Sequence, residues 1–237
     1  MTDYTLYYWP IQFRGQFVRS VLVHTGCTWE EAGYEATLAQ RTSAHGEQLI
    51  AHMGPPVLTD HQGKIHISQM PAILTYLGDK HGLTGTEPAA RAICLKLVCD
   101  ANDVLYEMTR YNGAQMWTDR AWAEFQPRLH RWMGVFEETA RRHGVTADTG
   151  FLLGGDAPGL GDLVTSTLWG TMTAKLPALR PVLDRQAPVI AGLADRIAAL
   201  PGQIDLKASS DAAFGDAWCG GQIEASLRQV LQRQAIG

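Results

Sequence analysis

The sequence predicts a mixed α+β part at residues 1–82, joined to an all-helical part at residues 86–237. Short β-favouring runs and turn residues occur only before residue 83, whereas helical periodicity occupies most of the chain after residue 85. The chain has 237 residues, 46% of them hydrophobic, so it is long enough to form one large or two small domains. The change of pattern at residues 83–85 favours two domains of unequal size.

The first part begins with an aromatic, β-favouring run at residues 4–9, which Pro10 ends. A helical pattern starts at Gln16, and Gly26 stands where a glycine commonly follows a helix. We next expect a weak strand at residues 28–34, a helix at 42–52, an antiparallel hairpin from 57–58 and 65–67, and a helix at 71–81. The predicted order is therefore βαβ, a further helix, and then ββα.

Strand signals disappear in the second part of the chain. Apolar residues between Ala121 and Phe136 recur at spacings of one, three and four, which is typical of an amphipathic helix. Further helices are expected at residues 87–112, 160–172, 188–200 and 222–234. Residues 201–219 show no helical period, and we expect them to be irregular.

The charge balance disfavours a nucleic-acid partner. Lys and Arg total 20 against 24 Asp and Glu, the formal net charge is −4, and no long basic run occurs. No apolar run approaches about 20 residues, which disfavours a membrane partner. Residues 1–5 lack the cationic start of a signal peptide, and the four cysteines have neither zinc nor Cys-x-x-Cys spacing. We therefore expect a cytoplasmic protein with reduced thiols and no metal.

Tyr7 and Tyr8 are the first candidates for chemistry, because they end the first predicted strand and precede a helix. Alternate residues of a strand face opposite sides, so only one of the two rings can face a given site. The alternative is that both rings pack in the core, and position alone favours that alternative.

Two further segments could present backbone groups to a ligand. Gly54-Pro55-Pro56 opens a strand, and a cis bond there would expose the preceding backbone, although a rigid turn with two trans prolines is commoner. Ser68-Gln69-Met70-Pro71 opens a helix whose free N–H groups could bind an anion, although a simple cap without a ligand is commoner.

Several motifs of the chain point to one family. The most specific is the run Ala72-Ile73-Leu74-Thr75-Tyr76-Leu77, which His81-Gly82-Leu83 follows. The others are the segments at residues 54–58 and 151–162, and the start Tyr8-Trp9 with Arg19 downstream. Together they resemble the cytosolic glutathione transferase family, in a bacterial-type form with a tyrosine-class-like N-terminus. The resemblance implies a thioredoxin-like, glutathione-binding domain at residues 1–82 and an all-helical, electrophile-binding domain at 86–237.

The resemblance also implies roles for single residues. Tyr8 would donate its hydroxyl hydrogen to the glutathione sulfur and hold it as the thiolate, which is the nucleophile. The glutathione-binding residues would be Trp9, Arg41 or His45, Pro55, the cis proline Pro56, Gln69, Met70 and, from the neighbouring subunit of a homodimer, Asp103 or Asp100. The pocket for the small electrophile would be lined by Ile11, Phe13, Tyr106, Tyr111 and Trp218.

Two departures from the family pattern concern glutathione binding. Met70 stands where the family has Ser or Thr, and Pro55 has no N–H to donate. The loss of two hydrogen bonds would weaken binding by roughly ten- to a hundredfold.

These departures keep two other interpretations open. One is a non-catalytic ligand-binding protein with the same fold. The other is a glutathione-dependent reductase or isomerase, which would need Cys219 as its thiol because no cysteine lies between Trp9 and Phe13.

Overall fold

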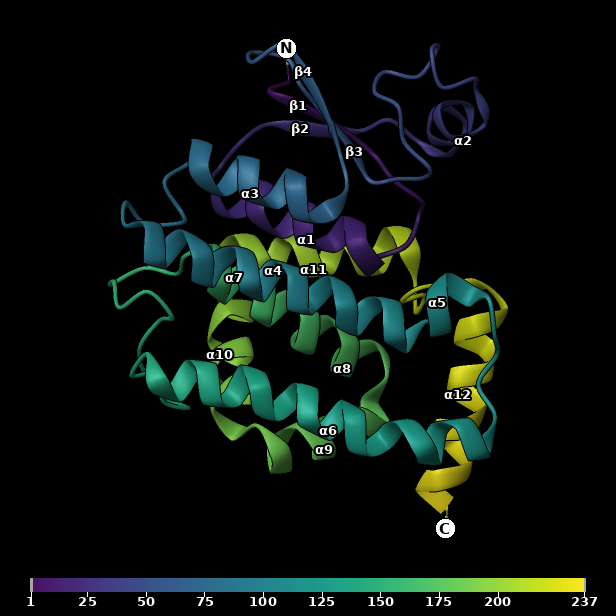
Figure 1. Ribbon diagram of the computed structural model, residues 1–237, viewed down its shortest axis with the longest axis vertical. Helices are drawn as coiled ribbons and strands as arrows, with labels where there is room; N and C mark the ends of the chain where they lie inside the picture. Colours follow the sequence, from purple (N-terminus) through teal and green to yellow (C-terminus); the bar gives the residue numbers. More distant parts are fainter. Residues whose placement is uncertain (1, 237) are drawn as a thin grey trace.

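The computed structural model describes residues 2–236, with side chains described up to Arg233. The predicted outer limits at residues 1 and 237 therefore lie outside the described residues. A small sheet with its helices lies at one end of the molecule, and the remaining helices form the other end (Figure 1).

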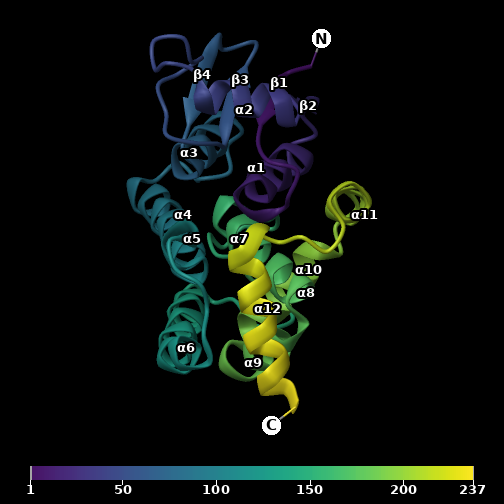
Figure 2. The ribbon, with the colours of Figure 1, turned by 90° about the vertical axis from the view of Figure 1, so that its right-hand side faces the viewer.

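The sheet has four strands: β1 (Tyr4–Tyr7), β2 (Trp29–Glu31), β3 (Val57–Asp60) and β4 (Ile65–Ser68). Their order is β2-β1-β3-β4, with β1 parallel to β2 and antiparallel to β3, which is antiparallel to β4. Helices α1 (Phe13–His24) and α3 (Met70–Lys80) lie between this sheet and the helices of the second part (Figures 1 and 2). This order and pairing confirm the predicted α+β arrangement with a thioredoxin-like topology.

The helix expected at residues 42–52 is wrong. Helix α2 is Tyr34–Thr42, so it ends where the expected helix begins. Side-chain amides satisfy the backbone of the loop after α2: Gln48 donates from Nε2 to the Gln40 carbonyl at 2.8 Å, and the Leu49 N–H donates to Gln40 Oε1 at 2.8 Å. Such local side-chain bonds offer the backbone an alternative to a helix.

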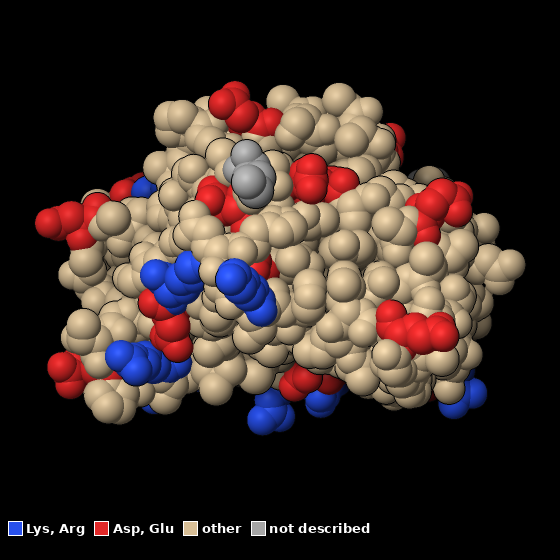
Figure 3. All heavy atoms as spheres, turned by 90° about the horizontal axis from the view of Figure 1, so that it is seen from above, with Lys and Arg blue, Asp and Glu red and all other residues tan. Residues whose placement is uncertain are grey.

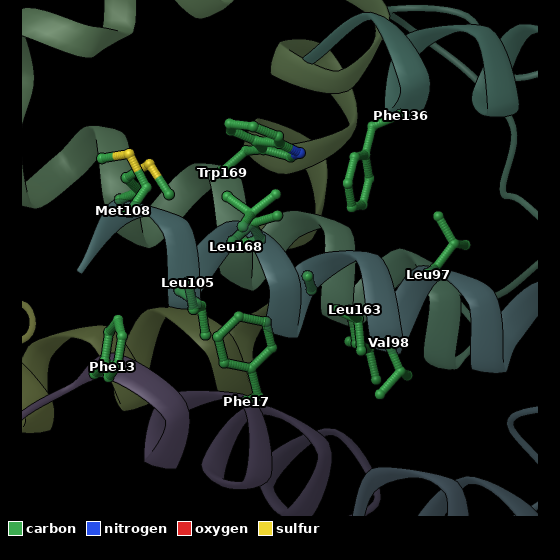
Figure 4. Packing of buried hydrophobic residues seen from close by; sticks show 14 of the residues in the cluster. Phe13, Phe17, Leu97, Val98, Leu105, Met108, Phe136, Leu163, Leu168 and Trp169 are labelled. Carbon is green, nitrogen blue, oxygen red and sulfur yellow. The ribbon is translucent and has the colours of Figure 1, made fainter. Parts of the chain in front are cut away.

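The helical part surrounds one apolar core. Figure 4 shows rings from α1, such as Phe17, approaching side chains of the long helix α4 (Pro88–Met108). The other elements of the helical part are α5 (Arg110–Gly113), α6 (Asp119–Arg142), α7 (Leu160–Ser166), the π-helical turn η1 (Thr167–Thr171), α8 (Met172–Lys175), η2 (Pro177–Leu179), α9 (Arg180–Gln186), α10 (Pro188–Ala198), α11 (Pro201–Phe214) and α12 (Gly221–Ile236). The predicted all-helical second part is confirmed.

Helix α11 corrects the expectation that residues 201–219 are irregular. Pro201 stands in its first turn, and only Leu206 and Ser210 are buried. The helix docks on α1 through polar contacts, including Gln16 Nε2 to Ser210 Oγ at 3.2 Å. A helix held mainly by polar contacts lacks the apolar stripe from which sequence reasoning detects helices.

Helix α4 ends in an unusual turn. The four residues of α5, Arg110, Tyr111, Asn112 and Gly113, have φ angles of 43°, 63°, 56° and 84°. Left-handed backbone costs about 1–2 kcal/mol per residue for side chains other than glycine, and asparagine tolerates it best. Arg110 and Tyr111 therefore bear most of the strain.

On the face shown in Figure 3, basic and acidic side chains lie singly or in small mixed groups separated by uncharged areas, without a continuous basic surface. Among the described residues, no helix combines the length and the apolar character that crossing a bilayer requires.

Candidate active site

Tyr8 follows β1 directly and lies at the start of α1. Its hydroxyl oxygen accepts a hydrogen bond from the Arg14 backbone N–H at 3.1 Å, and the side chain is 4% exposed. The ring packs on Gly15, where a Cβ atom would lie 2.3 Å from Cδ1 of the ring. Burial raises the pKa of Tyr8 to about 12, although Arg14 and Arg19 act in the opposite direction.

This environment makes Tyr8 a hydrogen-bond donor at neutral pH. A phenol with a pKa of about 12 keeps its proton. Its oxygen already accepts from Arg14, and no acceptor among the described residues takes its hydrogen. The hydroxyl hydrogen is therefore not engaged by a described residue.

The structure separates the two tyrosines of the first strand. Tyr7 is half-buried and pairs with Val57 across the sheet, whereas Tyr8 is buried beyond the end of the strand. The ring of Tyr8 is therefore buried, as expected if it packs in the core, and its hydroxyl group is held at the start of a helix.

Two arginines hold the loop around Tyr8. Arg14 donates from Nε to Asn102 Oδ1 at 3.2 Å, which connects α1 to α4. Arg19 is buried, donates from Nη1 to the Ile11 carbonyl at 2.9 Å and pairs with Glu31 at 2.6 Å. Sequence reasoning missed Arg14 and Asn102, because the key group of Arg14 is a backbone N–H that every residue except proline has.

Sheet register brings the double proline close to Tyr8. Tyr7 pairs with Val57, so Pro56 lies beside Tyr8. The Pro55–Pro56 bond is cis, and the alternative of two trans prolines is therefore not adopted. Pro56 is buried and Pro55 half-buried.

The start of α3 joins the same corner. Val57 also pairs with Ser68, so Gln69 and Met70 begin α3 beside the prolines. Gln69 is exposed and has a φ of 73°, a region that side chains other than glycine seldom occupy. Met70 is 1% exposed and belongs to the core, so its N–H, and not its side chain, is available at the helix start.

A third group of predicted residues gathers around Trp9. The Arg41 guanidinium lies 5.9 Å from the centre of the Trp9 ring, and the Tyr34 ring lies 5.9 Å from it. His45 is exposed on the loop after α2. Arg41 is therefore the cation that the structure brings to Trp9.

Asp103 lies apart from these residues within the chain. It is exposed on α4, whereas its neighbour Asn102 contacts Arg14. Partial burial of its carboxyl group, together with the charges of Asp100 and Glu107, nevertheless raises the pKa of Asp103.

The five residues expected in the electrophile pocket fall into two groups. Phe13 and Trp218 pack edge to face with ring centres 5.2 Å apart, and the Phe13 N–H donates to the Trp218 carbonyl at 3.0 Å. Ile11 lies beside Gly220 of the same tail. Tyr106 and Tyr111 form a separate edge-to-face pair with ring centres 5.4 Å apart, at the far end of α4.

The tail that holds Trp218 is fixed by one carboxylate. Glu224 Oε2 accepts from the N–H groups of Trp218, Cys219 and Gly220 at 2.9, 2.8 and 2.6 Å, and Arg228 binds its other oxygen. Burial alone would raise the pKa of Glu224, but these donors outweigh it and hold the pKa below its usual range. The one sequence signal for this role is an acidic residue in the first turn of the last helix.

The remaining candidates for chemistry are less reactive. Burial, and then the charge of Glu224, raises the pKa of the Cys219 thiol far above its ordinary value, which disfavours the thiolate. Among the described residues, no group of three or more His, Cys, Asp or Glu side chains could hold a metal ion.

The four-stranded sheet with a cis proline before β3, followed by an all-helical part, defines a two-part thioredoxin-like class of protein. A sequence profile described as glutathione S-transferase, C-terminal domain, matches residues 93–230. The chain therefore belongs to the glutathione S-transferase family. Comparison with curated proteins finds no match.

Solved structures share the fold over nearly the whole chain. The chain is similar to a Pi-class glutathione S-transferase from Onchocerca volvulus, with a TM-score of 0.74 and 19% identity over 92% of this chain and 98% of that one. It is also similar to a Nu-class enzyme from Haemonchus contortus, with a TM-score of 0.68 and 19% identity over 89% and 98%. The monomeric Na-GST-3 from Necator americanus matches with a TM-score of 0.68 and 19% identity over 87% and 97%.

Proposed function

We propose that the protein is a glutathione transferase in which Tyr8 stabilises the glutathione thiolate for attack on a small electrophile. The observation that supports this most is the Tyr8 hydroxyl, which accepts from the Arg14 N–H and keeps its own hydrogen for a ligand. A thiol attacks as its thiolate, and a hydrogen-bond donor beside the sulfur lowers the thiol pKa. The high pKa of Tyr8 keeps this donor protonated through the neutral range.

The proposed glutathione site is the corner where β1, β3 and α3 meet. The γ-glutamyl carboxylate would lie at the start of α3, near Gln69 and the Met70 N–H, where the helix dipole favours an anion. The backbone of Pro55 would face the cysteinyl part, beside the cis proline Pro56. Arg41, with His45 as the alternative, would bind the glycyl carboxylate, and Trp9 would line the site.

The proposal extends to the whole molecule. Residues 1–82 would bind glutathione and residues 86–237 the electrophile, in a cytoplasmic protein. In a homodimer, Asp103 of one subunit would approach the γ-glutamyl amine of the other. The similar Na-GST-3 is monomeric, so light scattering of this chain tests the dimer separately from the reaction.

Replacing Tyr8 by phenylalanine tests the proposed role of the hydroxyl. A hydrogen bond to a charged atom contributes about 1.5–3 kcal/mol, so Tyr8→Phe should lower kcat with a chloronitrobenzene acceptor about ten- to a hundredfold at neutral pH. Tyr7→Phe is the matched control and should leave turnover unchanged. Unchanged turnover in Tyr8→Phe would remove Tyr8 from the mechanism.

A non-catalytic protein is the second candidate, because Pro55 and the buried Met70 side chain withhold two usual contacts. Calorimetric titration with glutathione separates the two. Binding in the micromolar to low millimolar range supports the enzyme, and no binding supports the second candidate. The buried, high-pKa Cys219 gives the reductase interpretation little support.

A further inference from the structure

A cavity of about 300 Å³ lies between α11 and the neighbouring elements α1, η1, α8 and α10. Figure 2 shows α11 nearly end-on, beside α1 and α10. Pockets of about 300–1,000 Å³ hold small organic molecules. None of the residues proposed to bind glutathione or the electrophile lines this cavity, so it is separate from the site around Tyr8.

Polar side chains form the side of the cavity where α1 meets α11. Gln12 donates from Nε2 to Asp211 Oδ1 at 3.1 Å, and Ser20 donates from Oγ to Gln203 Oε1 at 3.0 Å. All four of these residues also line the cavity. A ligand there would therefore meet polar atoms that are already fixed in place by their neighbours.

Some of the polar atoms that line the cavity have no protein partner. Gln12 is 3% exposed and Thr167 is 7% exposed. Among the described residues, nothing bonds to Gln12 Oε1 or to the hydroxyl groups of Thr167 and Thr171. Buried polar groups are nearly always hydrogen-bonded, so these atoms need partners within the cavity. A hydroxyl group can both donate and accept, and it therefore suits all three.

The two threonines come from an unusual element. Thr167 and Thr171 are the first and last residues of the π-helical turn η1. Such turns are rare and are found frequently at functional sites. The irregular turn therefore gives independent support to a ligand site at this position.

The same cavity carries an excess positive charge beside Gln12. Lys175 is 9% exposed and donates from Nζ to Asp211 Oδ1 at 2.7 Å and to the Gly215 carbonyl at 2.6 Å. Lys207 donates to the other oxygen of Asp211 at 2.6 Å. Burial alone would raise the pKa of Asp211, but the bonds from both lysines lower it to about 2, so the group is ionised at neutral pH. Two cations therefore share one anion.

The other charged group that lines the cavity has the opposite balance. Arg180 binds both oxygens of Asp195 at 2.8 and 2.7 Å, and it also donates to Asp184 at 2.7 Å. One cation here faces two carboxylates. An anionic ligand is therefore attracted to Lys175 and Lys207, and not to Arg180.

We propose that this cavity binds small aliphatic hydroxy acids. The carboxylate of the ligand pairs with Lys175 and Lys207, and an ammonium group that donates only two of its three hydrogens has one left for it. The hydroxyl groups of the ligand bond to Gln12, Thr167 and Thr171. This site goes beyond the proposed transferase reaction, since it requires no glutathione.

Calorimetry without glutathione tests the proposal with three six-carbon probes: gluconate, hexanoate and sorbitol. Hexanoate has the carboxylate without hydroxyl groups, and sorbitol has hydroxyl groups without the carboxylate. We expect gluconate to bind at least about tenfold more tightly than either, because it alone makes both kinds of contact. If gluconate does not bind at millimolar concentration, or if either of the other probes binds equally well, the proposal is wrong.

The contribution of the unpartnered hydroxyl group is tested by Thr167→Val. Loss of one neutral hydrogen bond should weaken gluconate binding about three- to tenfold and leave hexanoate binding unchanged. Thr165→Val is the matched control, because the Thr165 hydroxyl is also buried without a partner but does not line the cavity. Equal losses of gluconate binding in the two variants would exclude Thr167 as a ligand contact.

The contribution of the excess charge is tested by Lys207→Gln, which leaves Asp211 paired with Lys175. At low ionic strength, gluconate binding should weaken about three- to tenfold, while sorbitol binding should stay the same. Arg131→Gln, an exposed change on α6, is the charge-matched control and should have no effect. An unchanged affinity for gluconate in Lys207→Gln would contradict the role of the shared carboxylate.

Discussion

At the scale of single residues, the position of Tyr8 depends on a neighbour without a side chain. Gly15 lies in the first turn of α1 and is buried under the Tyr8 ring. A glycine at this point has a steric reason, because any Cβ would overlap the ring. The hydroxyl can therefore reach the Arg14 N–H only while residue 15 remains glycine.

Gly15→Ala should accordingly displace the Tyr8 ring. Overpacking a buried contact costs about 1–3 kcal/mol, so we expect a lower Tm in thermal unfolding and a lower kcat. Gly134→Ala is the matched control, since a Cβ at Gly134 meets nothing within 4 Å and alanine favours a helix by up to about 1 kcal/mol. An unchanged Tm and kcat in Gly15→Ala would show that the ring is not confined as described.

Some residues of the candidate site can be predicted from the sequence, and others cannot. The family motifs point to Tyr8, whereas its position alone favours a plain core role for its ring. The sequence gives no signal for the bond between Arg14 and Asn102, which joins distant segments, or for the backbone N–H groups that Arg14 and the tail supply to Tyr8 and Glu224. The sequence shows that Met70 lacks a hydroxyl, but only the structure shows that its side chain is buried.

At the scale of elements, Glu224 ties the last helix to the tail before it. One carboxylate oxygen collects three successive N–H groups, and Arg228 also donates to the Asp216 carbonyl at 2.7 Å. Phe13 bonds the same tail to the start of α1. The tail is therefore held in a fixed position against Ile11 and Phe13.

This tie should depend on pH in a defined direction. The folded pKa of Glu224 lies below its ordinary value of 4.5, so its contribution to stability is complete above that pH and is lost as pH falls through the folded pKa. Glu224→Gln should cost about 1–3 kcal/mol at pH 7, and its difference from the unmodified protein should shrink in acid.

Thermal unfolding at neutral and acidic pH measures this difference. The control is Glu138→Gln, which removes an exposed carboxylate paired with Arg142 and should change the Tm little at either pH. If the Tm loss in Glu224→Gln is the same at neutral and acidic pH, the charge of the Glu224 carboxylate does not hold the tail in place.

The elements that sequence reasoning placed correctly are those with a strong period or clear boundaries. The hairpin of β3 and β4 and the helix α3 have turn residues and prolines at their ends, and α6 has a continuous aromatic stripe. The failures, α2 and α11, are helices with little burial, since only Thr37 is buried in α2 and only Leu206 and Ser210 in α11. The left-handed turn α5 had no signal beyond Asn112-Gly113, because Arg110 and Tyr111 are not residues that favour such backbone.

At the scale of the whole molecule, the arrangement of domains was more predictable than the pocket between them. A change from strand signals to helical periodicity is spread over many residues, so it survives errors at individual boundaries. The expected electrophile pocket required three segments to converge, from the start of α1, the end of α4 and the tail. In the structure they form a closed Phe13–Trp218 contact and a separate cavity beside Tyr106.

The proposed reaction depends on Tyr8 holding bound glutathione as the thiolate. Ultraviolet absorbance of the thiolate, followed against pH in the protein–glutathione complex, measures this directly. We expect the thiol pKa in the complex to lie at least about one unit below the ordinary cysteine value of about 8.5, and Tyr8→Phe to return it toward that value. A bound thiol with the same pKa in both proteins would contradict the proposed role of Tyr8.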